Sequence, residues 1–283
     1  MEYNLMIGGI GFHIVSHFEI RVGDIFTPFL LPSSAGSDVF VEFRDDFQNA
    51  PAITVPMLGD DVLLEYYDQD GFLTATKGGQ KGHIAVALCD PACTHLVCYI
   101  NTGVFGPQDA LSDLLRMIPM RRILQHHGVL FFHASQIALG NSGVLFTAPS
   151  GTGKTTQARL WRDHRAAAVI CNDRTLVCRG RTYGYPVDGS EPVRSGLIHD
   201  LGAIVLLKQN KENSVRRLKP SAALAGLLPQ LVIDTWDPTA RTFAIEQLME
   251  LLRSFPVYLL ECTPDSHAVD CLHRQLTEDG VIK

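Results

Sequence analysis

The sequence lacks several features that would direct a protein to a membrane, to nucleic acid or out of the cell. No apolar run in its 283 residues approaches membrane-spanning length, and residues 1–4 lack the basic segment that begins a signal peptide. The formal net charge of −6 gives no excess of positive charge for binding nucleic acid or an anionic membrane. We therefore expect a cytoplasmic protein that binds neither.

The seven cysteines give no sign of a disulfide framework, because they are odd in number and scattered along the chain. One group, Cys89, Cys93, His95 and Cys98, has spacings of four, two and three. Zinc sites usually bring ligands in close Cys-x-x-Cys pairs, so two strands joined by a turn at 90–92 are favoured here over a metal site. Four cysteines lie in apolar, strand-like runs and are expected to act as small hydrophobes: Cys98, Cys171, Cys178 and Cys262.

What is present points first to the stretch GVLFTAPSGTGKTTQARLW, in which an apolar run ends in a glycine-bearing loop at 148–155. The residues after the loop, 154–161, are typical of a helix. Strand, loop, Gly-Lys-Thr and helix in this order are the structural context of a phosphate-binding loop. The first loop position is Ala148 where the strict pattern has glycine, which is a tolerated variant. The sequence therefore predicts a nucleotide phosphate site rather than a chance glycine turn.

The residue types of this loop suit a phosphate chain. Phosphate oxygens need several backbone N–H groups aimed at one point and the positive end of a helix, and glycines allow the backbone to approach closely. Lys154 is expected to reach the β- and γ-phosphates, and the hydroxyl of Thr155 to bind Mg²⁺. The predicted nucleotide-binding residues are Ser150, Gly151, Thr152, Gly153, Lys154, Thr155 and Thr156.

Residues 1–105 are expected to form a β-rich N-terminal domain. The predicted strands cover residues 3–7, 10–15, 39–43, 62–67, 72–76, 84–88 and 96–100. Turn signals at Gly8-Gly9 and at 68–71 make hairpins of the first two strands and of the fourth and fifth. Short strands without a long helical period favour an antiparallel sheet or sandwich. His13 and His17 are more typical of packing or surface positions than of ligands.

Residues 106–283 are expected to form the nucleotide-binding domain, with a connecting helix at its start. The apolar spacing from Ala110 to Leu124 is helical, and Pro119 should break or kink that helix. Two strands are plausible within 126–139, joined to the loop strand through 140–143.

A short buried strand at 167–171 follows the loop helix and ends in Asn172, Asp173 and Arg174. An aspartate at the end of such a strand is well placed for the metal or for the attacking nucleophile. Further on, the loop 186–194 carries Asp188, Glu191 and Arg194, which are candidates for substrate or metal contact; a solvated loop explains them equally well.

The rest of the chain is expected to alternate strands and helices. Strands are predicted at 175–178, 181–185, 203–207 and 257–261, and helices at 221–228, 242–252 and 264–276, the last with Thr263 as N-cap. The run from Asn210 to Asn213 is similar to the guanine-reading Asn-Lys-x-Asp of GTPases. Asn213 stands where that motif has aspartate, so we interpret the run as a polar turn.

Residues 133–173 resemble the kinase domain of the HPr kinase/phosphorylase family, which shares a nucleotide site with ATP-dependent phosphoenolpyruvate carboxykinase. In that family a histidine followed by a small residue opens a hairpin whose second strand leads into the phosphate loop. Here His133-Ala134-Ser135 precedes Ala148 by fifteen positions. The family's next strand ends in an Asp-Asp pair and a basic residue, where this chain has Asn172-Asp173-Arg174. The run 206–213 also resembles a subgroup found with peptide-modification systems.

The resemblance implies an α+β or α/β chain, in which an HPr-kinase-like P-loop domain at 106–283 is preceded by the β-rich domain. It implies phosphoryl transfer from ATP with Mg²⁺ to a serine of a peptide or small protein, and, since relatives assemble as oligomers, a homo-oligomer. His133 would lie by the γ-phosphate, Lys154 would hold the phosphates, and Asp173 would ligate the metal or act as base. Asn172 departs from the acidic pair, and the segment linked to the family's phosphorylase activity is not found.

Three functional hypotheses remain open from the sequence. The first is a serine kinase of the kind just described. The second is a nucleotide-binding regulatory or scaffold protein with a degenerate site, which Asn172 favours because an amide cannot act as a base. The third and least favoured is a phosphotransferase of the phosphoenolpyruvate carboxykinase type, which is far longer and needs lysine and arginine positions not found here.

Overall fold

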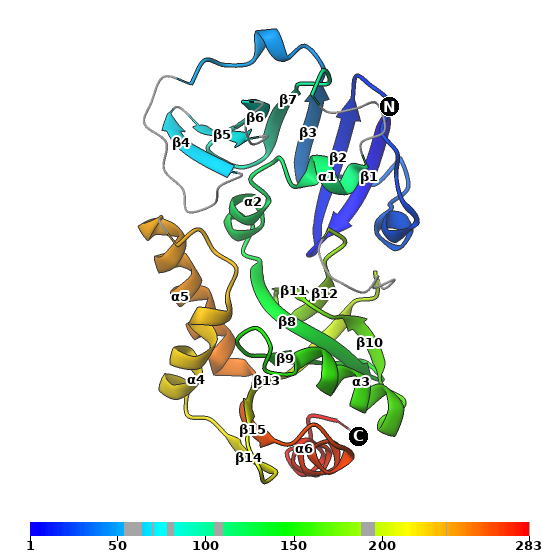
Figure 1. Ribbon diagram of the computed structural model, residues 1–283, viewed down its shortest axis with the longest axis vertical. Coiled ribbons are helices and arrows are strands. Elements are labelled where there is room, and N and C mark those ends of the chain that lie inside the picture. The colour runs from blue at the N-terminus through cyan, green and yellow to red at the C-terminus, as the bar shows by residue number, and fades with distance from the viewer. Residues whose placement is uncertain are drawn as a thin grey trace. The chain divides into compact units, whose positions relative to one another are not determined.

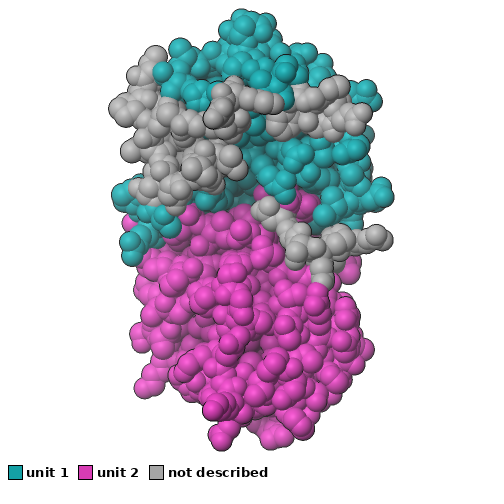
Figure 2. Space-filling view, in the orientation of Figure 1, with its two compact units in different colours: residues 1–127, 234–241 teal, residues 128–233, 242–283 magenta. Residues whose placement is uncertain are grey.

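The computed structural model (Figure 1) describes residues 1–53, 64–69, 71–77, 82–104, 110–187, 196–235 and 237–282. Its contacts divide the chain into two compact units, coloured separately in Figure 2. Unit 1 holds residues 1–127 and 234–241, and unit 2 holds 128–233 and 242–283. The division at 127 lies beyond the boundary expected near residue 105, and a later segment counts with the first unit. The two-domain organisation itself stays a prediction.

Unit 1 is built on one seven-stranded sheet in the order β1-β2-β3-β7-β6-β5-β4. The strands are β1 (Glu2–Ile7), β2 (Ile10–Ser16), β3 (Val39–Arg44), β4 (Leu64–Gln69), β5 (Gly71–Lys77), β6 (His83–Cys89) and β7 (His95–Ile100). The hairpins expected around Gly8-Gly9 and before Phe72 are confirmed. So is the pair of strands joined by a turn between Cys89 and His95. Residues 62 and 63, expected to begin the fourth strand, lie outside the described residues.

The expectation of an antiparallel sheet or a sandwich was wrong. The sheet is mixed, because β2 pairs with β3, and β3 with β7, in parallel. Parallel neighbours need a long crossover, and the connection from β2 to β3 supplies one that includes the short 3-10 helix η1 (Asp24–Phe29). The local pattern of a strand does not reveal which partner it will take, so pairing across such a connection is decided by the assembled core.

Two short helices complete unit 1 together with a second 3-10 helix, η2 (Phe47–Asn49). The helices are α1 (Leu111–Leu115) and α2 (Met120–His126), and Pro119 between them is the N-cap of α2, as expected from its missing N–H. They belong with the sheet: Leu111 N donates to Arg21 O, and the guanidinium of Arg122 lies 3.5 Å from the ring centre of Phe72.

Unit 2 is organised around the long strand β8 (Leu130–Leu139), which is one strand where two were expected. Its first half pairs with β11 (Arg174–Cys178), and its second half pairs with β9 (Ser142–Thr147) and β10 (Ala168–Cys171). β9 pairs in parallel with β13 (His199–Gln209), which also pairs with β12 (Arg181–Gly184). Since β11 and β12 form a hairpin, strands β8, β9, β13, β12 and β11 close a circuit of pairings.

The remaining strands extend the sheet beyond β13. β15 (Val257–Cys262) runs parallel to β13, and β14 (Ser214–Arg217), which was not expected, pairs with β15 at the edge. Three parallel strands, β9, β13 and β15, therefore end on the same side of the sheet. Ligands commonly bind outside the carboxyl ends of such strands.

Helices cover both faces of this sheet (Figure 1). α3 (Lys154–Arg165) and α6 (Ser266–Glu278) share one core, in which Trp161 and Leu272 pack with Phe146 of β9. α4 (Pro220–Leu227), the 3-10 helix η4 (Leu228–Gln230) and α5 (Pro238–Ser254) are associated with the other core, which includes Phe132 of β8. The alternation of β9 thus sends neighbouring side chains into two different cores.

The last helix begins two residues later than expected. Asp265, not Thr263, is the N-cap of α6, and its carboxylate accepts from the backbone N–H groups of His267 and Ala268. Thr263 Oγ1 donates to Asp265 Oδ2 at 2.7 Å. Aspartate and threonine are both favourable N-cap residues, so the local sequence is compatible with a helix that begins after either one. The structure shows that α6 begins after Asp265. In the described part of the chain, no helix combines the length and the apolar character needed to cross a membrane.

Candidate active site

The loop predicted to bind phosphate joins β9 to α3, and its glycines take conformations that other residues avoid. Gly151 has a φ of 78° and Gly153 a φ of 113°. Between them the chain turns back on itself, because both the backbone N–H and the hydroxyl of Thr152 donate to Pro149 O, at 3.3 and 2.8 Å. Ser150 and Gly151 are exposed at the tip of the loop.

The start of α3 presents backbone donors at this loop. The first helical bond recorded there runs from Gln157 N to Gly153 O at 2.9 Å, so the N–H groups of the preceding residues have no acceptor within the helix. Such a helix start, together with its dipole, attracts anions. Ser135 of β8 fixes its position, since the buried hydroxyl donates to Lys154 O at 2.9 Å. Thr155 is half-buried in this turn, and Thr156 is exposed.

Lys154 lies inside the loop rather than in solvent, with 7% of its surface exposed. Its ammonium donates to Ala148 O at 2.9 Å and to Pro149 O at 3.4 Å. Burial lowers the pKa of Lys154 below its ordinary value, while the carboxylate of Asp173 acts in the opposite direction. The loop therefore holds a partly desolvated positive charge, which interacts more strongly with an anion than the same charge in water.

His133 and Asp173, forty residues apart, are brought together by strand pairing. Arg174 on β11 stands opposite His133 on β8, and Ala134 N donates to Asp173 O at 3.0 Å. In this register the side chains meet: His133 Nε2 lies 2.8 Å from Asp173 Oδ1. Arg174 Nε lies 3.5 Å from the other carboxylate oxygen.

The environment of His133 favours its neutral form. Burial lowers its pKa from the ordinary 6.5, the positive charge of Lys154 adds to that effect, and Asp173 opposes it. A neutral imidazole next to a carboxylate must carry its proton on the facing nitrogen, so Nε2–H donates to Asp173. The pair is reachable, since the His133 and Asp173 side chains are 29% and 34% exposed.

Of the other predicted positions, some lie near the His133–Asp173 pair and some lie outside the described residues. Asn172, next to the carboxylate, is buried with 6% of its surface exposed. Asp188, Glu191 and Arg194 lie in the stretch 188–195, outside the described residues. The polar turn expected after β13 is confirmed, because it lies between the end of β13 at Gln209 and the start of β14 at Ser214. Asn213 Oδ1 accepts from Thr263 N at 3.0 Å and so joins this turn to the end of β15.

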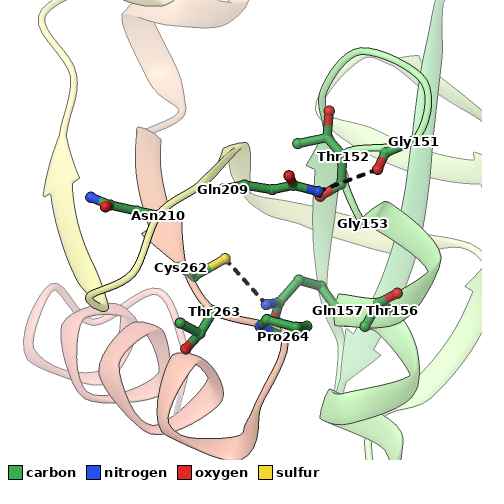
Figure 3. Close-up of a pocket in the computed structure, with 10 residues that line it drawn as sticks. All are labelled: Gly151, Thr152, Gly153, Thr156, Gln157, Gln209, Asn210, Cys262, Thr263 and Pro264. Atoms are coloured by element: carbon green, nitrogen blue, oxygen red, sulfur yellow. Dashed lines mark hydrogen bonds between the residues drawn. The ribbon is translucent and has the colours of Figure 1, made fainter.

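A cavity of about 390 Å³ opens beside the phosphate loop (Figure 3). The loop and α3 supply one side of it, and the ends of β13 and β15 supply the other. Its lining residues are Gly151, Thr152, Gly153, Thr156, Gln157, Gln209, Asn210, Cys262, Thr263 and Pro264. Gln209 also ties the two sides together, since its Nε2 lies 3.4 Å from both Gly151 O and Thr152 O. The volume lies within the range of ligand pockets.

Several residues of this region were not singled out by the sequence. Ser135 was considered only as part of the run His133-Ala134-Ser135, and Cys262 only as a small hydrophobe in a strand-like run. Gln157 and Gln209 lie in stretches that the sequence analysis considered, but neither was given a role of its own. One sequence signal could have identified Gln157, namely a polar residue on an otherwise apolar helix face. Gln157 is 2% exposed and lies beside buried Ala158 and Trp161.

Metal-binding capacity at the loop rests on oxygen ligands. Among the described residues, no group of three or more histidine, cysteine, aspartate or glutamate side chains could hold a metal ion. Mg²⁺ usually takes only one or two protein ligands and completes its shell with water and phosphate oxygens. The hydroxyl of Thr155 and the carboxylate of Asp173 are groups of that kind.

Comparison with known proteins adds little to this geometry. No protein-family model matches the sequence, and no curated protein matches it. Among solved structures, the Hpr(Ser) kinase/phosphatase from Coxiella burnetii is similar, with 14% identity, coverage of 53% of this chain and 95% of that one, and a TM-score of 0.27. A likeness of this size carries no conclusion about fold or activity. It does not bear on the peptide-modification subgroup either.

Proposed function

We propose that this chain is an ATP- and Mg²⁺-dependent kinase that transfers the γ-phosphate to a hydroxyl, with a serine of a peptide or small protein as acceptor. The observation that carries the proposal is a reachable His133–Asp173 pair within electrostatic range of Lys154 in a phosphate loop. Phosphoryl transfer requires groups that position phosphates, neutralise charge and orient a hydroxyl. This cluster contains one group for each task.

The loop fits the phosphates of a nucleotide. Its positive-φ glycines, the buried Lys154 ammonium and the donor groups at the start of α3 are the elements that bind a phosphate chain. Thr155 would hold Mg²⁺, which when bound supplies further neutralisation of the phosphate charge. Its hydroxyl is a hard oxygen ligand of the kind that this ion prefers, and Asp173, the other candidate ligand, is assigned here to the role of base.

Asp173 is the proposed base. Its carboxylate would accept the proton of the attacking hydroxyl, and the neutral His133 would hold the carboxylate in place through Nε2–H. Lys154 would bind the phosphate oxygens. Arg174, close to the second carboxylate oxygen, would limit the freedom of Asp173 to turn away.

The presence of Asn172 is compatible with an active site. It is 6% exposed, whereas the side chain of Asp173 is 34% exposed, so the carboxylate that this chain retains is the more accessible one. A buried carboxylate at position 172 would also carry a desolvation cost that an amide avoids. A regulatory or scaffold protein that binds nucleotide without turnover is the alternative that the assay must exclude.

The test is to measure ATP binding by calorimetry and phosphate transfer from radiolabelled ATP with Mg²⁺ to a serine-containing peptide library. Lys154→Ala should abolish ATP binding. Asp173→Asn should retain ATP binding and lower transfer by about 10²–10⁴-fold, the range for loss of a general base. The matched controls are Lys219→Ala and Asp163→Asn, at exposed positions outside the site, and both should behave as wild type.

The outcomes separate the candidate functions. ATP binding without any labelled acceptor, unchanged by Asp173→Asn, would favour the nucleotide-binding regulator. Turnover of oxaloacetate with ATP, followed spectrophotometrically, would favour the carboxykinase-type reaction. If wild type fails to bind ATP, the kinase proposal is wrong.

A further inference from the structure

Unit 1 holds a pair of cysteines that the candidate active site does not use. Cys89 is the last residue of β6, and Cys93 lies in the turn that leads to β7. Both are free and fully buried, and their thiols are hydrogen-bonded to each other. Two thiols in contact are placed for a disulfide, whose geometry requires the two residues to be close neighbours.

The turn between the two strands holds Cys93 against Cys89. Cys93 has a φ of 53°, in the left-handed region that residues other than glycine, asparagine and aspartate seldom adopt. Its backbone N–H donates to Asp90 O at 3.0 Å. The carboxylate of Asp90 closes the turn, since its Oδ1 accepts from Thr94 N at 2.7 Å and from His95 N at 2.8 Å. Strained backbone of this kind occurs preferentially at functional sites, and here it falls on a residue whose sulfur meets a second thiol.

A guanidinium lies next to the pair. Arg122 of α2 is 3.5 Å from the ring centre of Phe72, which stands directly opposite Cys89 in the sheet, and Arg122 is held there by Asp237 at 2.7 Å. The Cys89 thiol donates to the Cys93 sulfur and so lowers the pKa of Cys93; burial opposes this effect, and the charge of Arg122 adds to it. The same bond, together with burial, raises the pKa of Cys89. A thiolate beside a cation is the nucleophilic form of cysteine, so Cys93 is the reactive member of the pair and Cys89 its resolving partner.

We propose that Cys89 and Cys93 form a redox site that hydrogen peroxide oxidises to an intramolecular disulfide. The Cys93 thiolate attacks one oxygen of the peroxide, the O–O bond breaks, and the leaving hydroxide takes up a proton to become water. The sulfur of Cys89 then attacks the Cys93 sulfenic acid, the S–S bond forms, and the S–O bond breaks. The leaving hydroxide takes the proton of the Cys89 thiol. Two thiols are thus oxidised while one peroxide is reduced to two molecules of water.

Peroxide reaches the pair by a local opening of the turn. Cys93 is buried between exposed neighbours, Ala92 and Thr94, and the hydrogen bonds that Asp90 accepts lie at the surface. Opening these few residues exposes the Cys93 sulfur without unfolding the sheet. Cys98 is equally buried, but it lies inside a ladder, paired with Phe43 on one side and Ala87 on the other. Burial raises the pKa of its thiol. Cys98 is therefore the matched internal control.

The test treats the full chain with hydrogen peroxide, blocks the remaining thiols with N-ethylmaleimide under denaturing conditions, and identifies the products by peptide mass spectrometry. In wild type, Cys89 and Cys93 should become joined by a disulfide that dithiothreitol reverses. Their free thiols should disappear about tenfold faster than that of Cys98, or faster still. Cys89→Ser should accumulate sulfenic acid at Cys93, trapped by dimedone, because the resolving thiol is gone. Cys93→Ser should leave Cys89 reduced, and Cys98→Ser should form the disulfide at the wild-type rate.

Two results would overturn the proposal. One is that Cys89 and Cys93 of wild type are oxidised no faster than Cys98, a measurement that does not require any variant to fold. The other is that Cys89→Ser gives no dimedone adduct at Cys93 while wild type is oxidised. The outcome is independent of the kinase proposal, since neither ATP nor phosphate transfer takes part in this assay.

Discussion

Replacing Gly153 by alanine tests whether the backbone of the phosphate loop is what binds the nucleotide. Gly153 has a φ of 113°, well outside the angles that residues with a Cβ prefer. A Cβ at this position would meet nothing closer than Thr156 Cβ at 4.0 Å. The cost of the substitution is therefore conformational, with no steric clash added to it.

The expected magnitude follows from that angle. A left-handed conformation costs a residue with a Cβ about 1–2 kcal/mol, and a φ of 113° lies beyond the left-handed basin, so we expect a value near the upper limit. The loop can avoid this cost by relaxing, but ATP binding must then restore the original conformation. A cost of about 2 kcal/mol corresponds to a loss of roughly thirtyfold in ATP affinity.

The assay is calorimetric titration with ATP and Mg²⁺, together with urea unfolding of each variant. The control is Gly140→Ala, in the turn at the other end of β9, where φ is 57° and a Cβ would also meet nothing within 4 Å. It should lower stability by about 1 kcal/mol and leave ATP affinity unchanged. Wild-type affinity in Gly153→Ala, or an equal loss in Gly140→Ala, would show that the loop conformation is not what binds the phosphates.

Three further predictions concern stability. Burial lowers the pKa of His133 from 6.5, so the neutral imidazole contributes its full stabilisation above pH 6.5, and this stabilisation is lost as the pH falls below that value. His133→Gln should therefore make the free energy of unfolding less dependent on pH between about pH 5 and 7. Tyr258 donates to Asp279 at 2.6 Å, so Tyr258→Phe should cost about 1.5–3 kcal/mol in urea unfolding, and a double-mutant cycle with Asp279→Ala that finds no coupling would contradict this. Arg122 Nη2 lies 2.7 Å from Oδ2 of Asp237, whose side chain is 10% exposed. Arg122→Met should lower the free energy of unfolding by about 3–5 kcal/mol, because it leaves a largely buried carboxylate without its ion-pair partner. The double variant Arg122→Met with Asp237→Leu should recover part of this lost stability.

Local sequence signals predicted most of the elements correctly. The hairpin at Gly8-Gly9 and the break at Pro119 depend on the conformational limits of one or two residues, so they could be identified without knowing the fold. The same holds for the order of strand, glycine turn and helix in the predicted phosphate loop, because these parts are contiguous in the sequence. Errors arose where two local solutions were equally good, as at the Thr263 and Asp265 caps, or where the partner of a strand lies far along the chain, as for β3.

The sequence by itself predicts a phosphate loop, because all parts of that motif lie within one strand, turn and helix. Only the tertiary structure decided what surrounds the loop. The register of β8 against β11 brings His133 to within 2.8 Å of Asp173, and the parallel arrangement of β9, β13 and β15 brings Gln157 to Cys262. Residues that are forty or a hundred positions apart are joined by packing and strand pairing, and these depend on the whole core rather than on any short pattern.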